Sequence, residues 1–443
     1  MTVIHRVGPL FTDLYELTMA AAYFEHRVLA DATFSLFIRN YSSQRNYLVA
    51  AGLEDALCEL ESLRFSDADI AYLNKTGLFP SDFISYLKQF NFNGLVFAMP
   101  EGSIFFFDEP ILEVTAPVIE AQVIETFLLN TIGFQTMIAS KAARCIHAAQ
   151  DRSLIDFSLR RTQGHDAGMK VARSTYLAGF ARTSNVLAGL VYDIPTSGTM
   201  AHSYITAFDN EIDAFRAYSE TFPNNSILLI DTYETLEGAR NAVKVAKEMK
   251  KKGQSLIGVR LDSGNMIDLS QKVRKILDDA DLTDVKIFAS SGFDEFKIAD
   301  FLSKGAKIDA FGVGTKVGVS ADAPYVDIAY KMVRYNSRDV RKLSPGKITL
   351  AGEKQVFRKK DKDGRFLEDI IGLRDDVIKG GEPLLEKVME NGKCIQPHPS
   401  LQALQERFKK NFSALDDRYK SFQNHAQYPV KLSSRLKKLQ EIL

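Results

Sequence analysis

The sequence predicts an α/β fold, a barrel of parallel strands and helices, for the middle of this 443-residue chain. Between residues 119 and 340, short apolar runs alternate with amphipathic helical stretches, as in a parallel sheet buried on both faces. The later runs recur at intervals of about 25–30 residues, the length of one strand–helix unit, which favours a closed or nearly closed barrel. The apolar runs are SLIDFSL (153–159), SILLIDT (226–232), SLIGVRLD (255–262), VKIFASS (285–291) and IDAFGVG (308–314).

One helix of this region stands out at residues 234–253, ETLEGARNAVKVAKEMKKKG. Thr232 or Thr235 is its candidate N-cap, and Gly253 lies just past its expected end. Helices with such end signals between the apolar runs are what a strand–helix repeat requires.

The two outer regions predict different structures. Residues 1–118 mix helical and strand-like patterns, which we interpret as an N-terminal α+β domain. Residues 341–443 are basic and strand-like before they become a charged helical tail, and we expect this C-terminal extension to pack on the N-terminal domain. The expected helices are 13–24, 51–63 and 66–76, and the expected strands are 31–40 and 94–107, the last a hairpin bounded by Pro100 and Gly102.

Composition excludes several classes of protein. Apolar residues make up 45% of the chain and charged residues 25%, as in an ordinary soluble globular protein. Basic and acidic residues number 56 each, so bulk charge predicts neither a nucleic acid nor an anionic membrane as partner. No run approaches the ~20 apolar residues of a membrane span. Three scattered cysteines predict no disulfide framework, and we expect a cytoplasmic protein.

Polar residues follow the apolar runs, at the point where each expected strand ends. In parallel barrels the active site lies at this carboxyl edge, so five agreeing strand ends predict a site there. The alternative is that polar residues mark only the start of each loop. The residues concerned are Ser158, Arg160, Arg161, Asp231, Arg260, Asp262, Ser290, Ser291, Gly292, Gly314 and Thr315.

Two of the late loops have the features of phosphate sites. ASSGFDEF and FGVGTKVG place glycines where a strand meets a helix, so that backbone N–H groups can face an anion. Ser290, Ser291 and Thr315 add hydroxyl donors. Neither loop is a Walker motif or a dinucleotide fingerprint, and a turn without a ligand is the alternative. Consecutive placement predicts a site for a sugar 5′-phosphate.

The charged residues of two strand ends suit an anionic sugar. Arg260 and Asp262 share side-chain parity and can face one pocket, where Asp262 could accept hydrogen bonds from a diol. The alternative is an ion pair that caps the next helix. Arg160 and Arg161 place two guanidiniums together, which suits carboxylate or pyrophosphate oxygens, although a solvent-facing loop explains them too.

His202 stands at the start of the helical pattern HSYITAFDNEIDAF (202–215). A helix N-terminus disfavours the imidazolium and leaves a neutral ring nitrogen able to act as a nucleophile. The same N–H groups would favour a phosphoryl group once it is attached. The alternative is a histidine that caps its own helix.

Seven motifs in this order resemble those of the nicotinate phosphoribosyltransferases, over residues 8–330. They are FTDLYELTM, DFSLRRTQG, RTSNVLAG, IPTSGTMAHSY, GVRLDSGN, SSGFDEF and FGVGTKVG. The resemblance implies an incomplete α/β barrel beside an N-terminal sandwich-like domain. It also implies the conversion of nicotinate and phosphoribosyl pyrophosphate, with Mg²⁺, into nicotinate mononucleotide and pyrophosphate. Family members work as two-fold dimers with sites at the interface, so a homodimer is expected.

The resemblance assigns roles to individual residues. Phe157 should stack on one pyridine face and Tyr15 of a neighbouring subunit on the other, although both could be plain core aromatics. Arg160 and Arg260 would meet the pyrophosphate or the nicotinate carboxylate, and which meets which stays open. Asp262 would hold the ribose hydroxyls. Further candidates are Arg161, Thr199 and Ser203 for substrate, the residues Ser290, Ser291, Gly292, Gly312, Gly314 and Thr315 for the 5′-phosphate, and Asp231 with Asp262 for a metal ion.

The resemblance also implies energy coupling. The histidine of this GTxAHS pattern is phosphorylated by ATP in the family, so His202 is expected to be a transient phosphohistidine in an ATP-coupled, C–N-bond-forming ligase. A general base is less attractive, because the pyridine nitrogen has a lone pair and no proton to lose.

The choice between nicotinate and nicotinamide depends on charge at Ser184. The related nicotinamide enzymes have an aspartate there, which would repel a substrate carboxylate, whereas a hydroxyl can donate to it. A nicotinamide phosphoribosyltransferase remains the alternative, as does a non-catalytic phosphosugar-binding relative. An isomerase or aldolase barrel would need a lysine or carboxylate base, for which Lys316 is the nearby lysine.

Overall fold

The computed structural model describes residues 7–40, 45–344, 347, 349–422 and 426–443. The chain divides into two compact units: unit 1 consists of residues 1–140 and 323–443, and unit 2 of residues 141–322. The boundaries expected at 118/119 and 340/341 therefore differ from the limits of the units. Residues 119–140 belong to unit 1, and they include the first part of helix α6 (Glu125–Ala149), which crosses the limit between the units. Residues 323–340 belong to unit 1 because a strand shortly after residue 323 joins its sheet.

The main sheet of unit 1 joins strands from both ends of the chain. Its seven strands pair in the order β13-β12-β1-β5-β3-β17-β18, and each pairing is antiparallel. Seven consecutive residues of β1 are buried, so this strand lies in the core. The strands are β1 (Asp31–Asn40), β3 (Leu95–Ala98), β5 (Pro110–Pro117), β12 (Asp327–Tyr335), β13 (Arg338–Asp339), β17 (Glu386–Glu390) and β18 (Lys393–Cys394).

Two smaller sheets complete unit 1, and they correct one expectation. Residues 94–107 do not form a hairpin, because β3 pairs with β5 and β17 whereas β4 (Ile104–Phe105) pairs with β2 (Leu48–Val49). The Gly102 backbone N–H instead donates to the Ala50 carbonyl at 2.9 Å, which joins the turn at residues 100–102 to the segment that follows β2. The other sheet has the order β16-β14-β15-β19, with β14 (Lys354–Lys360), β15 (Phe366–Leu373), β16 (Gly381–Pro383) and β19 (Val430–Leu432).

The helices of unit 1 lie close to where the sequence predicts them. Ser66 closes a capping box with Asp69 at the start of α3, which explains the accurate start of the helix expected at 66–76. The helical tail after residue 400 is confirmed. The helices are α1 (Leu14–Glu25), α2 (Leu53–Ser62), α3 (Asp67–Thr76), α4 (Ser81–Leu87), α5 (Val118–Val123), α15 (Leu401–Ala414), α16 (Asp417–Lys420) and α17 (Ser434–Ile442).

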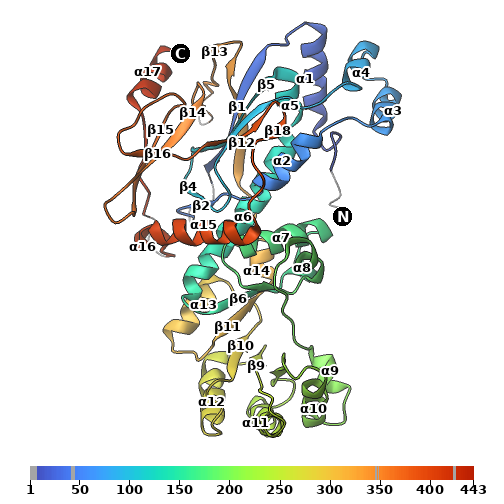
Figure 1. Ribbon diagram of the computed structural model, residues 1–443, viewed down its shortest axis with the longest axis vertical. Helices are drawn as coiled ribbons and strands as arrows, with labels where there is room; N and C mark the ends of the chain where they lie inside the picture. Colours follow the sequence, from blue (N-terminus) through green and yellow to red (C-terminus); the bar gives the residue numbers. More distant parts are fainter. Residues whose placement is uncertain (1–6, 41–44, 345–346, 348, 423–425) are drawn as a thin grey trace. The chain divides into compact units, whose positions relative to one another are not determined.

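Unit 2 contains the predicted parallel sheet. Its six strands pair in the order β7-β6-β11-β10-β9-β8, and Figure 1 shows β6, β11, β10 and β9 in succession. The end strands β7 and β8 do not pair with each other, so the barrel is incomplete, as the family resemblance implied. The strands are β6 (Ser153–Asp156), β7 (Arg182–Thr183), β8 (Ile227–Leu229), β9 (Gly258–Leu261), β10 (Lys286–Ala289) and β11 (Ala310–Val313).

Helices follow the strands of unit 2, and two expectations about them are wrong. The 202–215 pattern forms two helices, because Asn210 accepts a hydrogen bond from the Asp213 backbone and starts a new one. The N-cap of α11 is Glu234, whose carboxylate accepts the N–H groups of residues 236 and 237, and neither Thr232 nor Thr235. The helices are η1 (Leu159–Arg161), α7 (His165–Leu177), α8 (Val186–Tyr192), α9 (His202–Thr206), α10 (Glu211–Thr221), α11 (Thr235–Lys251), α12 (Met266–Asp278), α13 (Glu295–Ser303) and α14 (Thr315–Gly318).

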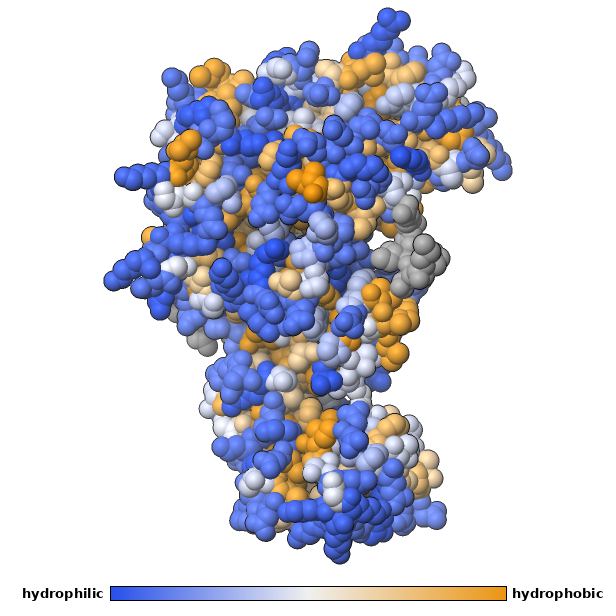
Figure 2. All heavy atoms as spheres, in the orientation of Figure 1, coloured by the Kyte–Doolittle hydropathy of each residue, from blue (hydrophilic) through white to orange (hydrophobic). Residues whose placement is uncertain are grey.

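Figure 2 shows a mainly hydrophilic face with small, separate apolar patches. Among the described residues, no helix is both long enough and apolar enough to cross a bilayer.

Candidate active site

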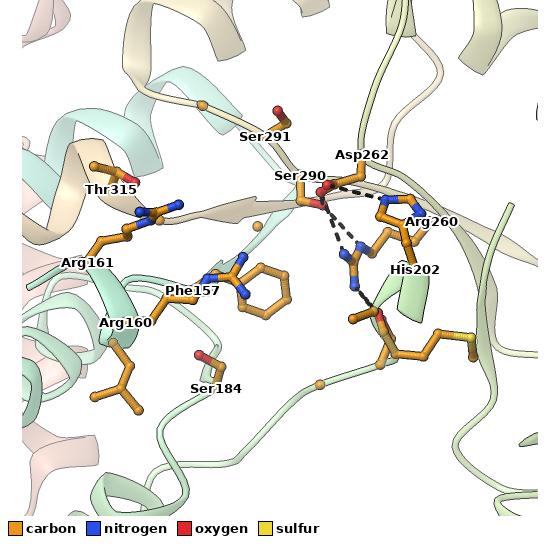
Figure 3. A pocket seen from close by; sticks show the side chains of 18 of the residues that line it. Phe157, Arg160, Arg161, Ser184, His202, Arg260, Asp262, Ser290, Ser291 and Thr315 are labelled. Carbon is orange, nitrogen blue, oxygen red and sulfur yellow. Dashed lines mark hydrogen bonds and ion pairs between the residues drawn. The ribbon is translucent and has the colours of Figure 1, made fainter. Parts of the chain in front are cut away.

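A cavity of about 770 Å³ opens at the carboxyl edge of the parallel sheet of unit 2. This volume lies in the range of small-molecule sites. Figure 3 shows Arg160, Arg161 and Phe157 on one side of it and Arg260, Asp262 and His202 on the other. The lining residues are Phe157, Leu159, Arg160, Arg161, Ser184, Gly198, Thr199, Met200, Ala201, His202, Ser203, Arg260, Asp262, Ser290, Ser291, Gly292, Gly312, Gly314 and Thr315.

The structure therefore brings together the site residues that the sequence predicted, with two exceptions. Tyr15 belongs to α1 of unit 1 and is not among the lining residues, and Asp231 lies behind the cavity wall. The ends of the apolar runs had indicated many of the others, because successive parallel strands end at one edge, His202 was indicated by its place at a helix start, and the family resemblance had indicated the remainder. The lining residues Leu159, Gly198, Met200 and Ala201 were not predicted, because nothing in these apolar and small side chains signals a site.

Arg260 is the centre of the polar network in the cavity wall. Its Nε donates to Ser290 Oγ at 3.1 Å, and its Nη1 donates to Thr199 Oγ1 at 2.5 Å and to the Met200 carbonyl at 3.0 Å. Its Nη2 lies 3.6 Å from Asp262 Oδ1, which also accepts from Ser290 Oγ. Because Arg260 is held by the loop at 199–200 and by two strand ends, its guanidinium has one fixed orientation. An ion pair with Asp262 exists, as the sequence alternative proposed, but it faces the cavity.

The Arg260 guanidinium is largely buried in this wall. Burial lowers the pKa of Arg260, the charges of Asp262 and Asp231 oppose this, and the charge of Arg160 lowers the pKa further. Arg160 and Arg161 are exposed and lie on the short helix η1, next to the cavity. Guanidiniums on both sides of one cavity suit an anion bound between them (Figure 3). The geometry therefore favours a phosphate, pyrophosphate or carboxylate as ligand.

His202 is held by one ring nitrogen and presents the other to the cavity. Its Nδ1 lies 3.0 Å from Thr232 Oγ1, and its Nε2 lies 3.9 Å from Asp262 Oδ2. The backbone N–H groups at the start of α9 donate no hydrogen bond to this side chain, so His202 does not cap its own helix. Thr232 was predicted only as a possible helix cap. Its place after a strand, beside Asp231, was the signal for a role in the site.

Asp231 supports the loop that contains Asp262. Its Oδ2 accepts the Asp262 backbone N–H at 2.8 Å and Ser263 Oγ at 2.6 Å. Its Oδ1 is buried and has no hydrogen-bond partner among the described residues. Within the part of the chain that the structure describes, no cluster of three or more acidic, cysteine or histidine side chains is arranged to hold a metal ion. A cation here would need oxygen ligands from a bound substrate as well.

The two glycine-containing loops lie at neighbouring strand ends, after β10 and β11. Ser291 and Gly292 have φ values of +95° and +65°, so Ser291 adopts a backbone conformation that costs energy outside glycine. Lys316 donates from Nζ to Asp294 at 2.6 Å. Ser291 and Thr315 both line the cavity (Figure 3). Strained backbone that is held in place at a cavity is typical of a ligand-binding loop.

Phe157 is half-buried, and its ring packs against bare backbone. A Cβ at Gly312 would lie 2.4 Å from Phe157 Cδ2, and a Cβ at Gly314 would lie 3.0 Å from the Phe157 carbonyl oxygen. The strand end can therefore hold the aromatic ring at this place only because both neighbours are glycine. One face of the ring is supported by the protein, and the residue lines the cavity.

Ser184 is half-buried at the turn after β7. Its backbone N–H donates to the Asp156 carbonyl at 2.8 Å. Its hydroxyl makes no hydrogen bond to another residue in the described part of the chain, so it can bond to a ligand.

Tyr15 is not a core aromatic, because 49% of its surface is exposed. Burial of its hydroxyl raises the pKa of Tyr15, and the charges of Glu125, Glu16 and Asp13 raise it further. The side chain is therefore neutral, as a stacking partner for a pyridine ring should be.

Comparison with known proteins identifies relatives along nearly the whole chain. Residues 152–349 match the nicotinate phosphoribosyltransferase (NAPRTase) family, residues 10–133 match its N-terminal domain and residues 379–440 its C-terminal domain. A nicotinate phosphoribosyltransferase of Mycobacterium tuberculosis is 44% identical, over 98% of this chain and 94% of the relative. One from Bacillus subtilis is 37% identical, over 96% and 92%. The crystal structure of human nicotinic acid phosphoribosyltransferase superposes with a TM-score of 0.87, at 28% identity, and the match covers 98% of this chain and 99% of that one.

Proposed function

Because the chain belongs to the nicotinate phosphoribosyltransferase family, we propose that the cavity of unit 2 is where it converts nicotinate and phosphoribosyl pyrophosphate. The enzyme is a phosphoribosyltransferase of NAD biosynthesis. It joins the pyridine nitrogen of nicotinate to C1 of the ribose and breaks the bond from C1 to the pyrophosphate oxygen. The products are nicotinate mononucleotide and pyrophosphate.

One observation supports this site above the others: Arg160 and Arg260 converge on a single cavity that also contains Asp262. Two cations at one cavity suit the oxygens of pyrophosphate or a carboxylate, and the Asp262 carboxylate can accept hydrogen bonds from ribose hydroxyls. The donors after β10 and β11 then suit the 5′-phosphate at the far end of the same sugar. The substrate would therefore lie along the carboxyl edge of the sheet.

The proposed reaction requires no proton transfer between the protein and the attacking nitrogen. The pyridine nitrogen attacks with its own lone pair, so no general base is needed at the nucleophile. Charge separates as the C1–O bond breaks, with positive charge on the ribose and negative charge on the departing pyrophosphate. Arg260 is fixed by four polar contacts, so it would stabilise the negative charge of the leaving group without rearrangement. Such preorganised electrostatic stabilisation is usually the largest contribution to the rate enhancement.

Mg²⁺ fits this site only together with substrate. The ion prefers one or two carboxylates plus phosphate oxygens and water, and Asp262 with the unpartnered oxygen of Asp231 offers that many. When bound, it would supply positive charge to the pyrophosphate. Asp262 would then orient the ribose, and Asp231 would hold the Asp262 loop.

Coupling to ATP is proposed through His202. Its Nε2 faces the cavity, and Thr232 binds Nδ1, so the ring has an oriented nitrogen that can attack the γ-phosphorus. A nitrogen–phosphorus bond forms, the bond to the ADP oxygen breaks, and ADP leaves with the electron pair. The enzyme would then act as an ATP-coupled ligase and carry a transient phosphohistidine.

Recognition of nicotinate is proposed at Ser184 and Phe157. The Ser184 hydroxyl can donate to the substrate carboxylate, and the exposed face of Phe157 can stack on the ring. An aspartate at position 184 would favour an amide, so the serine supports nicotinate over nicotinamide.

A homodimer is proposed because two helices expose apolar side chains. Leu14, Tyr15 and Met19 are exposed on α1 of unit 1, and Val186 and Leu190 of α8 in unit 2 are each 77% exposed. Apolar side chains on single helices are typical of subunit interfaces. Tyr15 would then cover the pyridine ring in the site of the partner subunit. We propose a cytosolic location, which the three free cysteines support.

A barrel isomerase or aldolase is less well supported. It would need a free lysine or carboxylate base in the cavity, and Lys316 pairs with Asp294 instead. The deciding experiment is a pyrophosphate-release assay with nicotinate, phosphoribosyl pyrophosphate and Mg²⁺, with and without ATP. Release that depends on nicotinate supports the proposal, and release with nicotinamide alone would overturn it.

A further inference from the structure

Asp156 is a buried carboxyl group beneath the cavity. It is the last residue of β6, and no part of its surface is exposed. Its Oδ1 accepts the Ser158 N–H at 2.9 Å and the Ser158 hydroxyl at 2.6 Å, and its Oδ2 accepts the Thr183 hydroxyl at 2.7 Å. It does not line the cavity itself.

These bonds join two segments that approach the substrate from different strands. Ser158 follows Phe157 directly and begins the turn that leads to Arg160 and Arg161. Thr183 directly precedes Ser184, and its hydroxyl also accepts the Asn185 N–H at 3.1 Å. The Asp156 carbonyl accepts the Ser184 N–H at 2.8 Å, so one residue holds the second segment from both its backbone and its side chain.

The Asp156 carboxyl group is the acceptor that three donors share. The Ser158 backbone N–H can only donate, whereas the Ser158 and Thr183 hydroxyls can each donate or accept. Burial raises the pKa of Asp156, and the hydrogen bonds from Ser158 and Thr183 oppose this. An alanine would remove both oxygens and every side-chain connection, whereas an asparagine could keep both connections by donating its NH₂ group to a hydroxyl oxygen.

We propose that Asp156 is a positioning residue for nicotinate: it fixes the Phe157 ring and the Ser184 hydroxyl relative to each other, so that stacking and carboxylate recognition are satisfied by one molecule. The inference rests on the proposed function of the cavity. Arg260, Asp262 and the phosphate loops are attached to β9, β10 and β11, and the hydrogen bonds and ion pairs given above for Arg260 and Asp262 do not involve the Asp156 carboxylate. The carboxylate should therefore affect the pyridine substrate more than the ribose phosphate.

The test is steady-state kinetics of Asp156→Ala, with each substrate varied in turn. The KM for nicotinate should rise about tenfold or more, from the loss of the hydrogen bonds that hold the two segments. The KM for phosphoribosyl pyrophosphate should rise less than the KM for nicotinate, because only the turn at Ser158 connects Asp156 to the arginines. Asp284→Ala is the matched control, because Asp284 is exposed in the loop before β10, at the opposite edge of the sheet, and both constants should be unchanged.

Thr183→Val is the second variant, in case Asp156→Ala does not fold. It removes one of the three donors and keeps the shape of the side chain, and we expect the same selective rise in the nicotinate KM, of at least about threefold. If a folded variant leaves both KM values unchanged, or raises them equally, the inference is wrong. A wild-type protein without nicotinate-dependent turnover would instead overturn the proposed function, so the two failures are distinguishable.

Discussion

Replacement of Gly312 by alanine should weaken nicotinate binding, because the new methyl group would displace the Phe157 ring. The new Cβ would lie 2.4 Å and 2.5 Å from Phe157 Cδ2 and Cε2, and 3.3 Å from Ser290 Cβ. Carbon atoms at contact are about 3.5–4.0 Å apart, so the ring has to move by about 1 Å. Gly312 is not in the left-handed region, so the backbone accepts alanine and the clash alone is measured.

The cost divides between stability and binding. Forcing a methyl group into a packed position costs about 1–3 kcal/mol. Phe157 is half-buried and can move toward the cavity, so part of the cost should appear as lost stacking on the pyridine, worth about 0.5–1.5 kcal/mol. We therefore expect the nicotinate KM to rise between about twofold and tenfold.

The measurements are the KM for each substrate and the free energy of unfolding in urea. Gly133→Ala is the matched control: this glycine lies on α6 in unit 1, and its Cβ would meet Ile328 and Val326 at 3.4–3.6 Å, which is ordinary contact. The control should retain both KM values and full stability. If Gly312→Ala retained the wild-type nicotinate KM with a displaced Phe157 ring in its crystal structure, stacking on Phe157 would be ruled out.

Three other predictions concern roles that the geometry proposes. Ser184→Asp should raise the nicotinate KM by about tenfold or more and the nicotinamide KM far less, because only nicotinate is an anion; equal changes in a two-substrate comparison would remove Ser184 from the specificity pocket. His202→Ala should abolish stimulation by ATP and leave a slow ATP-independent reaction, and Thr232→Val should reduce the stimulation while His202 is still present; undiminished stimulation of His202→Ala, measured as pyrophosphate release, would contradict the phosphohistidine. Tyr15→Ala and Arg260→Ala should each be nearly inactive alone. An equimolar refolded mixture should recover about a quarter of wild-type activity, because about half of the dimers are mixed and each mixed dimer has one intact site of two. A mixture that stays inactive would argue against shared sites.

The strand ends of unit 2 show how far sequence reasoning reached in this protein. Arg260 and Asp262 were predicted to face one pocket from side-chain parity, and they do. Ser290 and Gly314 were located as residues that follow apolar runs, because parallel strands that are buried on both faces have a clear pattern and a fixed polarity. The roles of these residues came from the resemblance to a family, and they stay predictions.

Side-chain partners were less predictable than positions. Thr232 was assigned to a helix cap, but Glu234 caps α11 and Thr232 binds His202. The sequence pattern predicted no role for Asp156, because an aspartate at the end of an apolar strand does not reveal the buried hydroxyls around it. The expected hairpin at residues 94–107 failed for a related reason: turn residues show that a chain reverses and do not show which strand it pairs with.

The alternation of apolar and polar residues along the chain determined the strands, their helices and the edge at which the polar groups gather, because these depend on local periodicity and on which faces avoid water. The tertiary structure decided which side chains meet: Arg260 with Thr199 and His202 with Thr232 are contacts between residues far apart in the chain. Such contacts depend on how the strands align in space, and no local pattern carries that information.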